Sequence, residues 1–211
     1  MSANTAAQST RGASRIRARN LAVTAMLSAV AFVLMFLDFP IPFLIPAFVK
    51  MDFSELPALL AAFSLGPVYG VAVCLVKNLI HLAITTTGGA GEVCNFLLGA
   101  CFTFAAGLLY QRVKSRKGAL VGALVGALVG AVIMAVLSVP LNYYISYPIY
   151  TKFMPIDAIL NMYREIRPNS GGLLECLIVF NAPFTLVKGL LTTALCFLIY
   201  KPLSPILHGN R

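Results

Sequence analysis

The sequence is poor in charged residues and contains no tryptophan. Only 11% of its 211 residues are Asp, Glu, Lys or Arg, whereas about a quarter are charged in an average soluble domain. So little charge cannot cover a water-soluble core, which excludes a soluble Rossmann, barrel or sandwich enzyme. An apolar content of 59% and a mean hydropathy of +0.87 likewise exclude a disordered chain. The composition therefore predicts an integral membrane protein.

Motifs for catalysis and metal binding are also missing. The sequence has no P-loop, no HExxH pair and no Gly-x-Ser-x-Gly elbow, and its only histidines are His81 and His208. No two cysteines have CxxC spacing, and all five lie in or beside apolar segments, so we interpret them as packing residues: Cys74, Cys94, Cys101, Cys176 and Cys196. We therefore predict no enzyme activity, no metal site and no resident cofactor.

The apolar runs predict an all-α membrane protein with six transmembrane helices in one domain, residues 21–201. A basic tail, 1–20, precedes this domain and a short tail, 202–211, follows it. The second span is short for a membrane crossing, so it must be tilted or shielded by protein. Pro67, after Gly66, fits the first position of the third helix. The predicted spans are 21–37, 54–65, 67–84, 93–111, 118–141 and 174–200.

Basic residues predict the orientation of the spans. Six spans place both termini on one side, together with the turn at Gly66 and the joint 112–117. Ten of the sixteen basic residues fall on that side and four on the other, so we expect both termini in the cytoplasm. The proline-rich stretch 39–50, which cannot be helical throughout, then faces outward with the loops near Gly91 and 150–172.

Small residues recur at helical spacing in two spans. Gly118, Gly122, Gly126 and Gly130 are each four residues apart, a pattern that lets two helices approach closely in lipid. Ala22, Ala25 and Ala29 form a similar face on the first span. That face fits either internal packing or docking of another membrane subunit.

Polar side chains inside spans are costly, about 2.5–3.5 kcal/mol for a charged residue, and are candidates for function. Asn181, Thr185 and Lys188 form one polar stripe on the last span. Lys188 lies roughly 18 Å from either end of the span, too deep for its ammonium to reach water. It must therefore face protein, a cavity or a ligand.

The hairpin of spans two and three carries a second polar group. Glu55 and Lys77 are equally distant from Gly66, so we expect a structural ion pair between them. Asp52 and Glu55 also fit a capping pair at a helix start. Asn78 and His81, at i and i+3, are the better candidates to reach a ligand.

A third polar group lies at the outer rim. Glu92 and Asn95 open the fourth span, where the helix dipole alone favours an acid. Asn142 follows Pro140 among tyrosines and has no structural role that the sequence explains; a bend at Pro140 would aim it inward.

Five segments, in this order, resemble the riboflavin-specific S components of energy-coupling factor (ECF) vitamin transporters: KMDFSELPALLAAFSLGPVYG (50–70), VKNLIHL (76–82), GEVCNFLLG (91–99), LNYYISYPIYT (141–151) and PFTLVKG (183–189). The resemblance implies a six-helix subunit of the bacterial cell membrane that captures riboflavin from outside. It also implies a membrane coupling protein and two ATPases as partners, with ATP used by those partners only. No nucleic acid is expected.

The resemblance also assigns site residues. Asn142 and Lys188 match family positions that contact the flavin ring, and Thr185 stands where the family usually has asparagine. The resemblance places the site between the proline-rich loop and the outer halves of the later helices. We therefore expect Thr185 and Asn181 to assist at the ring and the loop at Pro46 and Phe48 to close over it. Asn78, His81, Glu92 and Asn95 are expected to receive the ribityl hydroxyls, and Ala22, Ala25 and Ala29 to dock on the coupling protein.

Three alternatives remain open from the sequence. The chain fits an S component for FMN or another vitamin, or a stand-alone secondary transporter with its own coupling ion. A membrane-embedded enzyme would need a catalytic constellation that the sequence does not show.

Overall fold

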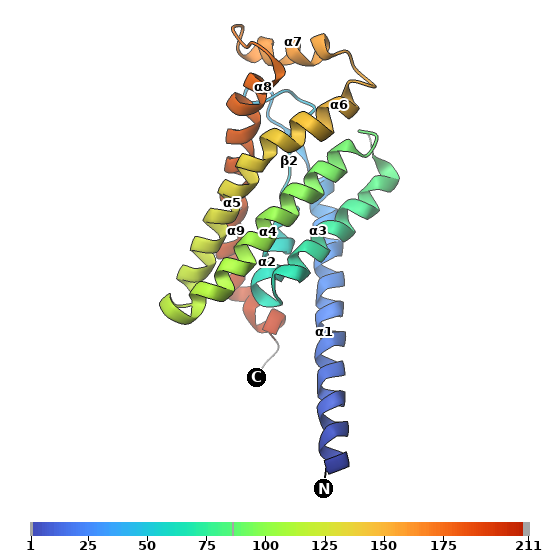
Figure 1. Cartoon of the computed structure of the whole chain (residues 1–211), viewed down its shortest axis with the longest axis vertical. Helices are drawn as coiled ribbons and strands as arrows, with labels where there is room; N and C mark the ends of the chain where they lie inside the picture. The colour runs from blue at the N-terminus through green and yellow to red at the C-terminus, as the bar shows by residue number, and fades with distance from the viewer. Residues whose placement is uncertain (1, 86, 209–211) are drawn as a thin grey trace.

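The computed structural model describes the backbone of residues 2–85 and 87–208, with the side chains of all of these except 2–13, 15, 114–117 and 200–208. In chain order the elements are α1 (Ser2–Phe36), β1 (Phe39–Pro40), β2 (Lys50–Met51), α2 (Glu55–Ser64), α3 (Pro67–His81), the 3₁₀ turn η1 (Leu82–Ile84), α4 (Ala90–Lys117), α5 (Ala119–Leu141), the π turn η2 (Asn142–Ser146), α6 (Tyr147–Tyr150), α7 (Ile156–Ile166), α8 (Leu173–Cys176), the π turn η3 (Leu177–Asn181) and α9 (Ala182–His208) (Figure 1).

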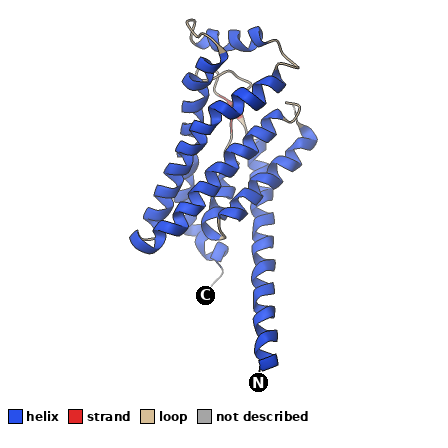
Figure 2. Cartoon of the chain, viewed as in Figure 1, coloured by secondary structure: helices blue, strands red, loops and turns tan. Residues whose placement is uncertain are grey.

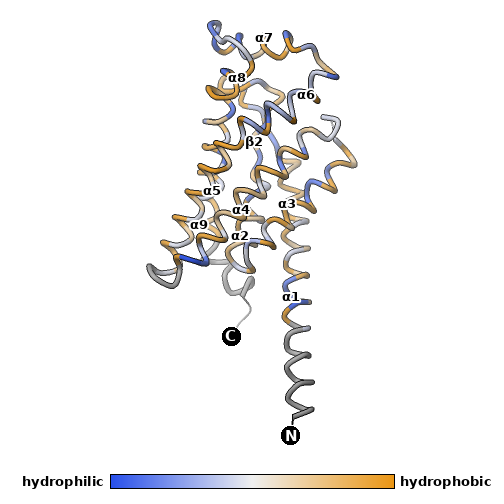
Figure 3. Tube along the Cα trace, viewed as in Figure 1, coloured by the Kyte–Doolittle hydropathy of each residue, from blue (hydrophilic) through white to orange (hydrophobic). Residues whose placement is uncertain are grey.

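The fold is a bundle of apolar helices, which confirms the all-α membrane class (Figures 2 and 3). Five stretches of the described chain are long and apolar enough to cross a membrane: Ile16–Phe36, Pro67–Ile84, Ala90–Val113, Ala119–Tyr150 and Leu173–Ile199. The expected second span corresponds to α2, which has only 10 residues and a length of about 15 Å. A sixth crossing therefore stays a prediction.

Protein shields α2 on almost every side. Eight of its ten residues are buried, among them Glu55 and Leu59. The helix ends where the sequence predicts, because Gly66 adopts a φ of +124° that favours glycine and Pro67 then starts α3. A short polar-ended helix thus lies inside the bundle, where it can present Glu55 to other helices.

The helices differ from their predicted bounds at several places. The backbone of α1 is helical from Ser2, well before the expected start at Leu21, because this segment is rich in Ala and Arg, which favour helix. The fifth span continues beyond Leu141 through a π turn, and the last span contains a π turn near its start. The stretch 150–172, expected as a polar loop, contains α7, whose inward face carries the buried Ile159 and Tyr163 at i and i+4.

The two ends of the bundle differ in content. The start of α1, the end of α9 and the α4–α5 turn lie at one end, and α7 lies at the other (Figure 1). Residues 37–54, which we call the strap, contain β1 and β2; these pair antiparallel, with Phe39 opposite Met51. The strap lies toward the same end as α7. This grouping matches the predicted grouping of the loops, while the side of the membrane that each end faces stays a prediction.

The repeat of glycines at every fourth residue from 118 to 130 brings α5 close to α4. A side chain at Gly126 would place its Cβ 2.4 Å from the backbone oxygen of Ala106, and one at Gly130 would lie 2.7 Å from that of Phe102. The backbone of α4 at Ala106 and Phe102 could move away from such a side chain only if the two helices separated. The close approach predicted from the glycine spacing is therefore confirmed as packing within the chain.

We expect Gly126→Leu to lower the thermal unfolding midpoint in detergent, because overpacking costs about 1–3 kcal/mol and here the obstacle is backbone. Val132→Leu is the matched control, since Val132 is 53% exposed on the same helix. Equal midpoints for the two variants would contradict the close packing of α5 on α4.

Candidate functional site

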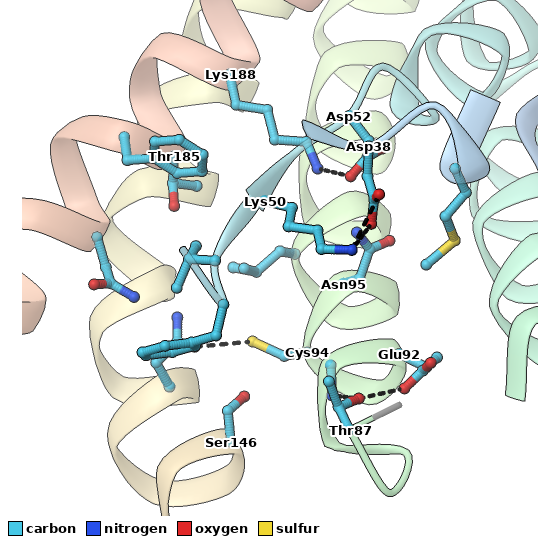
Figure 4. Close-up of a pocket in the computed structure, with 18 of the residues that line it drawn as sticks. Asp38, Lys50, Asp52, Thr87, Glu92, Cys94, Asn95, Ser146, Thr185 and Lys188 are labelled. Atoms are coloured by element: carbon cyan, nitrogen blue, oxygen red, sulfur yellow. Dashed lines mark hydrogen bonds and ion pairs between the residues drawn. The ribbon is translucent and has the colours of Figure 1, made fainter. Parts of the chain in front are cut away.

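A cavity lies at the α7 end of the bundle, beneath the strap (Figure 4). Seven parts of the chain contribute to its wall: α1, the strap, α2, α3, α4 with the turn before it, the α5–η2–α6 rod and the η3–α9 rod. The wall is formed by Met35, Asp38, Phe48, Val49, Lys50, Asp52, Glu55, His81, Thr87, Gly91, Glu92, Cys94, Asn95, Leu98, Met134, Asn142, Ser146, Tyr147, Tyr150, Asn181, Phe184, Thr185 and Lys188.

Two lysines and two acids form a buried ion cluster at the inner end of this cavity. Lys188 Nζ lies 2.8 Å from Asp52 Oδ2 and 3.1 Å from Glu55 Oε2. Lys77 Nζ lies 2.9 Å from Glu55 Oε1 and also donates to the Ser54 hydroxyl. The expected Glu55–Lys77 pair is confirmed. Because unpaired charge is so costly at this depth, the cluster ties the strap, α2, α3 and α9 together.

Asp52 is an ion-pair partner that also accepts a backbone N–H at the start of α2. Its Oδ2 accepts from Lys188 over 2.8 Å, and its Oδ1 accepts the backbone N–H of Ser54 over 2.8 Å. Burial on its own would raise the pKa of its carboxyl, but the ammonium groups of Lys188 and Lys77 and the hydrogen bond from Ser54 lower that pKa well below its usual range. The N-cap residue of α2 is Ser54, which makes no side-chain cap bond. Asp52 thus binds a backbone N–H at this helix start, as the capping interpretation expects, whereas Glu55 is directed to the two lysines.

The remaining charged side chains of the wall are paired as well. Lys50 Nζ lies 3.0 Å from Asp38 Oδ2 at the mouth, within the strap. His81 Nδ1 lies 2.8 Å from Glu92 Oε1, and the Thr87 hydroxyl donates to Glu92 Oε2 over 2.9 Å. Figure 4 shows the Asp38–Lys50, Asp52–Lys188 and Thr87–Glu92 contacts in one view.

The side chain of Asn181 is held by a chain of hydrogen bonds from Tyr147 and Tyr163, which we call the tyrosine relay. The Tyr163 hydroxyl donates to Asn181 Oδ1 over 2.7 Å and is itself hydrogen-bonded to the Tyr147 hydroxyl. Burial raises the pKa of Tyr163 well above its usual value, so this hydroxyl stays protonated and acts as a donor. Because Oδ1 is occupied, the Nδ2 amide is the end of Asn181 left to donate to a ligand.

Asn142 and Asn78 make contacts nearer to their own helices. Asn142 Nδ2 donates to the Ser138 carbonyl over 2.7 Å, and its Oδ1 accepts the Cys94 thiol at 3.7 Å. Asn78 Nδ2 donates to the Cys74 carbonyl over 2.8 Å and to Asn95 Oδ1 over 3.2 Å. Asn78 therefore supports Asn95 from behind the wall.

Two π turns bring polar side chains to the wall. η2 ends at Ser146 and η3 ends at Asn181, and each is followed two residues later by a proline, Pro148 and Pro183. Proline has no N–H and its ring clashes with the carbonyl four residues earlier, which fits a widened turn before it. Pro140, from which we expected a bend, lies inside the regular helix α5, two residues before η2 begins.

The structure brings eight of the ten expected ligand-binding residues to this one cavity: Lys188, Asn142, Thr185, Asn181, His81, Glu92, Asn95 and Phe48. Asn78 lies behind Asn95, and Pro46 lines a separate hollow against α7 with Met162 and Ile166. Among the described residues, no group of three or more His, Cys, Asp or Glu side chains could hold a metal ion.

Sequence reasoning missed several wall residues. Tyr147 and Tyr150 are among them, and Phe48 packs against both rings, with centroids 6.3 and 6.0 Å apart. Ser146 and Cys94 carried no signal of their own. The tyrosine spacing 143, 144, 147 and 150 could have indicated a helix with one inward face.

Comparison with known proteins agrees with this architecture. Residues 19–203 match the family described as "ECF transporter, substrate-specific component". The chain is 34% identical over 189 residues to the riboflavin transporter RibU of Staphylococcus aureus (strain TCH60), covering 90% of this chain and 92% of that protein. It is 32% identical over 199 residues to the riboflavin transporter FmnP of Bacillus subtilis (strain 168), covering 93% and 97%.

A solved structure also matches over nearly its whole length. The structure described as "Structure and mechanism of the S component of a bacterial ECF transporter" superposes with a TM-score of 0.70 at 33% identity, covering 90% of this chain and 98% of that chain. The resemblance inferred from the five sequence segments is thereby confirmed. The chain belongs to the family of substrate-specific S components of ECF transporters.

Proposed function

We propose that this chain is the riboflavin-capturing subunit of an ECF transporter in the bacterial cell membrane. It binds riboflavin from outside, and a membrane coupling protein with two ATPases drives uptake. The names of the Staphylococcus and Bacillus relatives support riboflavin as the ligand. The family description supports a subunit that supplies substrate specificity rather than an enzyme.

The observation that carries this proposal is that the lysines of the cavity are already paired. Lys50 pairs with Asp38, and Lys188 pairs with Asp52 and Glu55. Lys77 adds a further partner for Glu55 from behind, and Glu92 is bound by the His81 ring and the Thr87 hydroxyl. This pairing favours an uncharged ligand, since an anion would find both wall lysines engaged. Riboflavin is uncharged, with a flat ring, one polar edge and a polyhydroxyl tail.

Lys188 is the donor that we assign to a ring carbonyl. An ammonium group has three protons. One is donated to Asp52 Oδ2 over 2.8 Å, and Glu55 Oε2 lies 3.1 Å from the same nitrogen as a second ion-pair partner. The two acids hold the ammonium group in position and leave it able to donate to a ligand, which pre-organises the site. Asn142 pairs with the imide side of the ring, while Thr185 and the Nδ2 amide of Asn181 assist.

The ribityl hydroxyls are assigned to the group at the α3–α4 side of the cavity. His81, Glu92 and Asn95 line the wall there and offer both donors and acceptors. Asn78 contributes by fixing the amide of Asn95. Hydroxyl groups can both donate and accept, so a network of this kind suits a polyhydroxyl tail.

The strap closes this site. Phe48 forms an aromatic cluster with Tyr147, Tyr150 and Tyr163, which offers an apolar face to the ring. The cavity volume is about 210 Å³, below the roughly 300–1,000 Å³ of most small-molecule sites. We therefore expect the strap to move outward when riboflavin enters.

The docking face on α1 is available to a partner. Ala22, Ala25 and Ala29 are all exposed, whereas Thr24 and Ser28 turn inward and are buried. Small exposed side chains on one helical face permit close contact with a second membrane helix. We assign this face to the coupling protein.

We expect Lys188→Met to weaken riboflavin binding about 10- to 100-fold, because a hydrogen bond to a charged group contributes about 1.5–3 kcal/mol. Binding is measured by quenching of riboflavin fluorescence in a titration with purified protein, and the colour of that protein provides a first check for bound flavin.

Lys77→Met is the matched control for this variant. It removes the other ammonium from the same ion cluster, but Lys77 does not line the cavity. Both variants should unfold at lower temperature, and only Lys188→Met should lose affinity strongly. Equal affinities for the two variants would remove Lys188 from the site, and tighter binding of FMN than of riboflavin would contradict the proposed ligand.

We expect the double variant Ala25→Trp/Ala29→Trp to abolish ATP-dependent riboflavin uptake in cells while riboflavin binding stays unchanged, since both side chains are exposed. Val30→Trp is the control, because Val30 is exposed on α1 but about 100° around the helix from Ala29. Surviving uptake in the double variant would place the docking face elsewhere. Uptake by this chain alone in liposomes under a proton gradient would instead indicate a secondary transporter.

A further inference from the structure

The hydroxyl of Ser146 is buried and forms no hydrogen bond of normal geometry with any described residue; its polar neighbour is the thiol of Cys94, a weak acceptor. The residue is 1% exposed. A buried polar group that is poorly satisfied costs free energy, and nearly all such groups in native proteins have a good partner. A stronger partner from outside the chain would therefore be favourable for the Ser146 hydroxyl.

Other buried hydroxyls in the helices are satisfied locally. Ser28 donates to the carbonyl of Thr24 over 2.8 Å, and Thr193 donates to that of Gly189 over 2.7 Å. Ser146 lies in the π turn η2, and its hydroxyl makes no such bond to a carbonyl of its own helix.

The position of Ser146 indicates what its partner is. Of the three buried hydroxyls that lack a hydrogen bond of normal geometry in the described part of the chain, Ser146, Ser170 and Thr192, only Ser146 lines the cavity. Figure 4 shows its oxygen turned to the side on which Cys94 lies. Asn142, at the start of the same π turn, also lines the cavity and is bonded to Cys94.

We propose that Ser146 is a ligand-contacting residue, whose hydroxyl hydrogen-bonds the same polar edge of the flavin ring that Asn142 holds. This assignment rests on riboflavin being the ligand. Asn142 and Ser146 open and close one π turn, so their side chains reach the cavity from the same segment.

The test compares Ser146→Ala with the wild-type protein by fluorescence titration. We expect binding to weaken about three- to tenfold, the value of one neutral hydrogen bond. The thermal unfolding midpoint without ligand should not fall, because the hydroxyl loses no strong partner within the chain. Lumiflavin, which carries the ring but no ribityl chain, should lose affinity by the same factor as riboflavin.

Ser138→Ala is the matched control. Ser138 is a buried serine of the same helical rod, but its hydroxyl donates to the Ala135 carbonyl over 2.7 Å and it does not line the cavity. Its affinity for riboflavin should equal that of the wild type.

Two outcomes would overturn the assignment while wild-type protein binds riboflavin. One is an unchanged affinity of Ser146→Ala for riboflavin, whether or not its unfolding midpoint falls. The other is a loss of affinity for riboflavin but not for lumiflavin. If wild-type protein binds neither flavin, the proposed function fails first, so the two failures are distinguishable.

Discussion

The structure depends on the neutralisation of charge inside a bundle that faces lipid. Two ammonium groups and two carboxylates meet where α2, α3, α9 and the strap converge. Removing one partner from a buried ion pair costs about 3–5 kcal/mol, because the other charge is left uncompensated. The four groups therefore bind the strap to the bundle and fix the position of Lys188. The same requirement explains why α2, too short to be an ordinary span, lies inside the bundle and presents Glu55 to both lysines.

Irregular backbone is concentrated where the cavity needs it. Within the described residues, both π turns lie on the cavity wall, and each precedes a proline by the same spacing. A π turn realigns the side chains of a helix without interrupting the span, which matters because an open backbone is costly in lipid. The prolines thus allow two membrane helices to change the face that they present, from helix packing to the cavity wall.

The outer part of the site depends on parts of the chain that are distant in sequence. Phe48 from the strap, Tyr147 from α6 and Tyr163 from α7 pack as one aromatic cluster, and the tyrosine hydroxyls fix the amide of Asn181. A movement of the strap would therefore disturb the aromatic face and the relay together. The aromatic face of the cavity and the position of the Asn181 amide therefore depend on the same contacts.

The sequence by itself determined the solvent, the fold class and most of the polar groups that reach the cavity. Hydropathy along the chain predicted the membrane helices, and the cost of polar groups in lipid singled out Lys188, Asn181 and Asn142, because both properties are local. The pairing of Glu55 with Lys77 was also predictable, since a tight turn at Gly66 sets the two helices in register. Only the tertiary structure decided that Lys188 pairs with Asp52, a residue 136 positions away, that α7 covers the site, and that Ser146 lacks a strong partner. Those facts depend on distances between segments far apart in the chain, which no local pattern records.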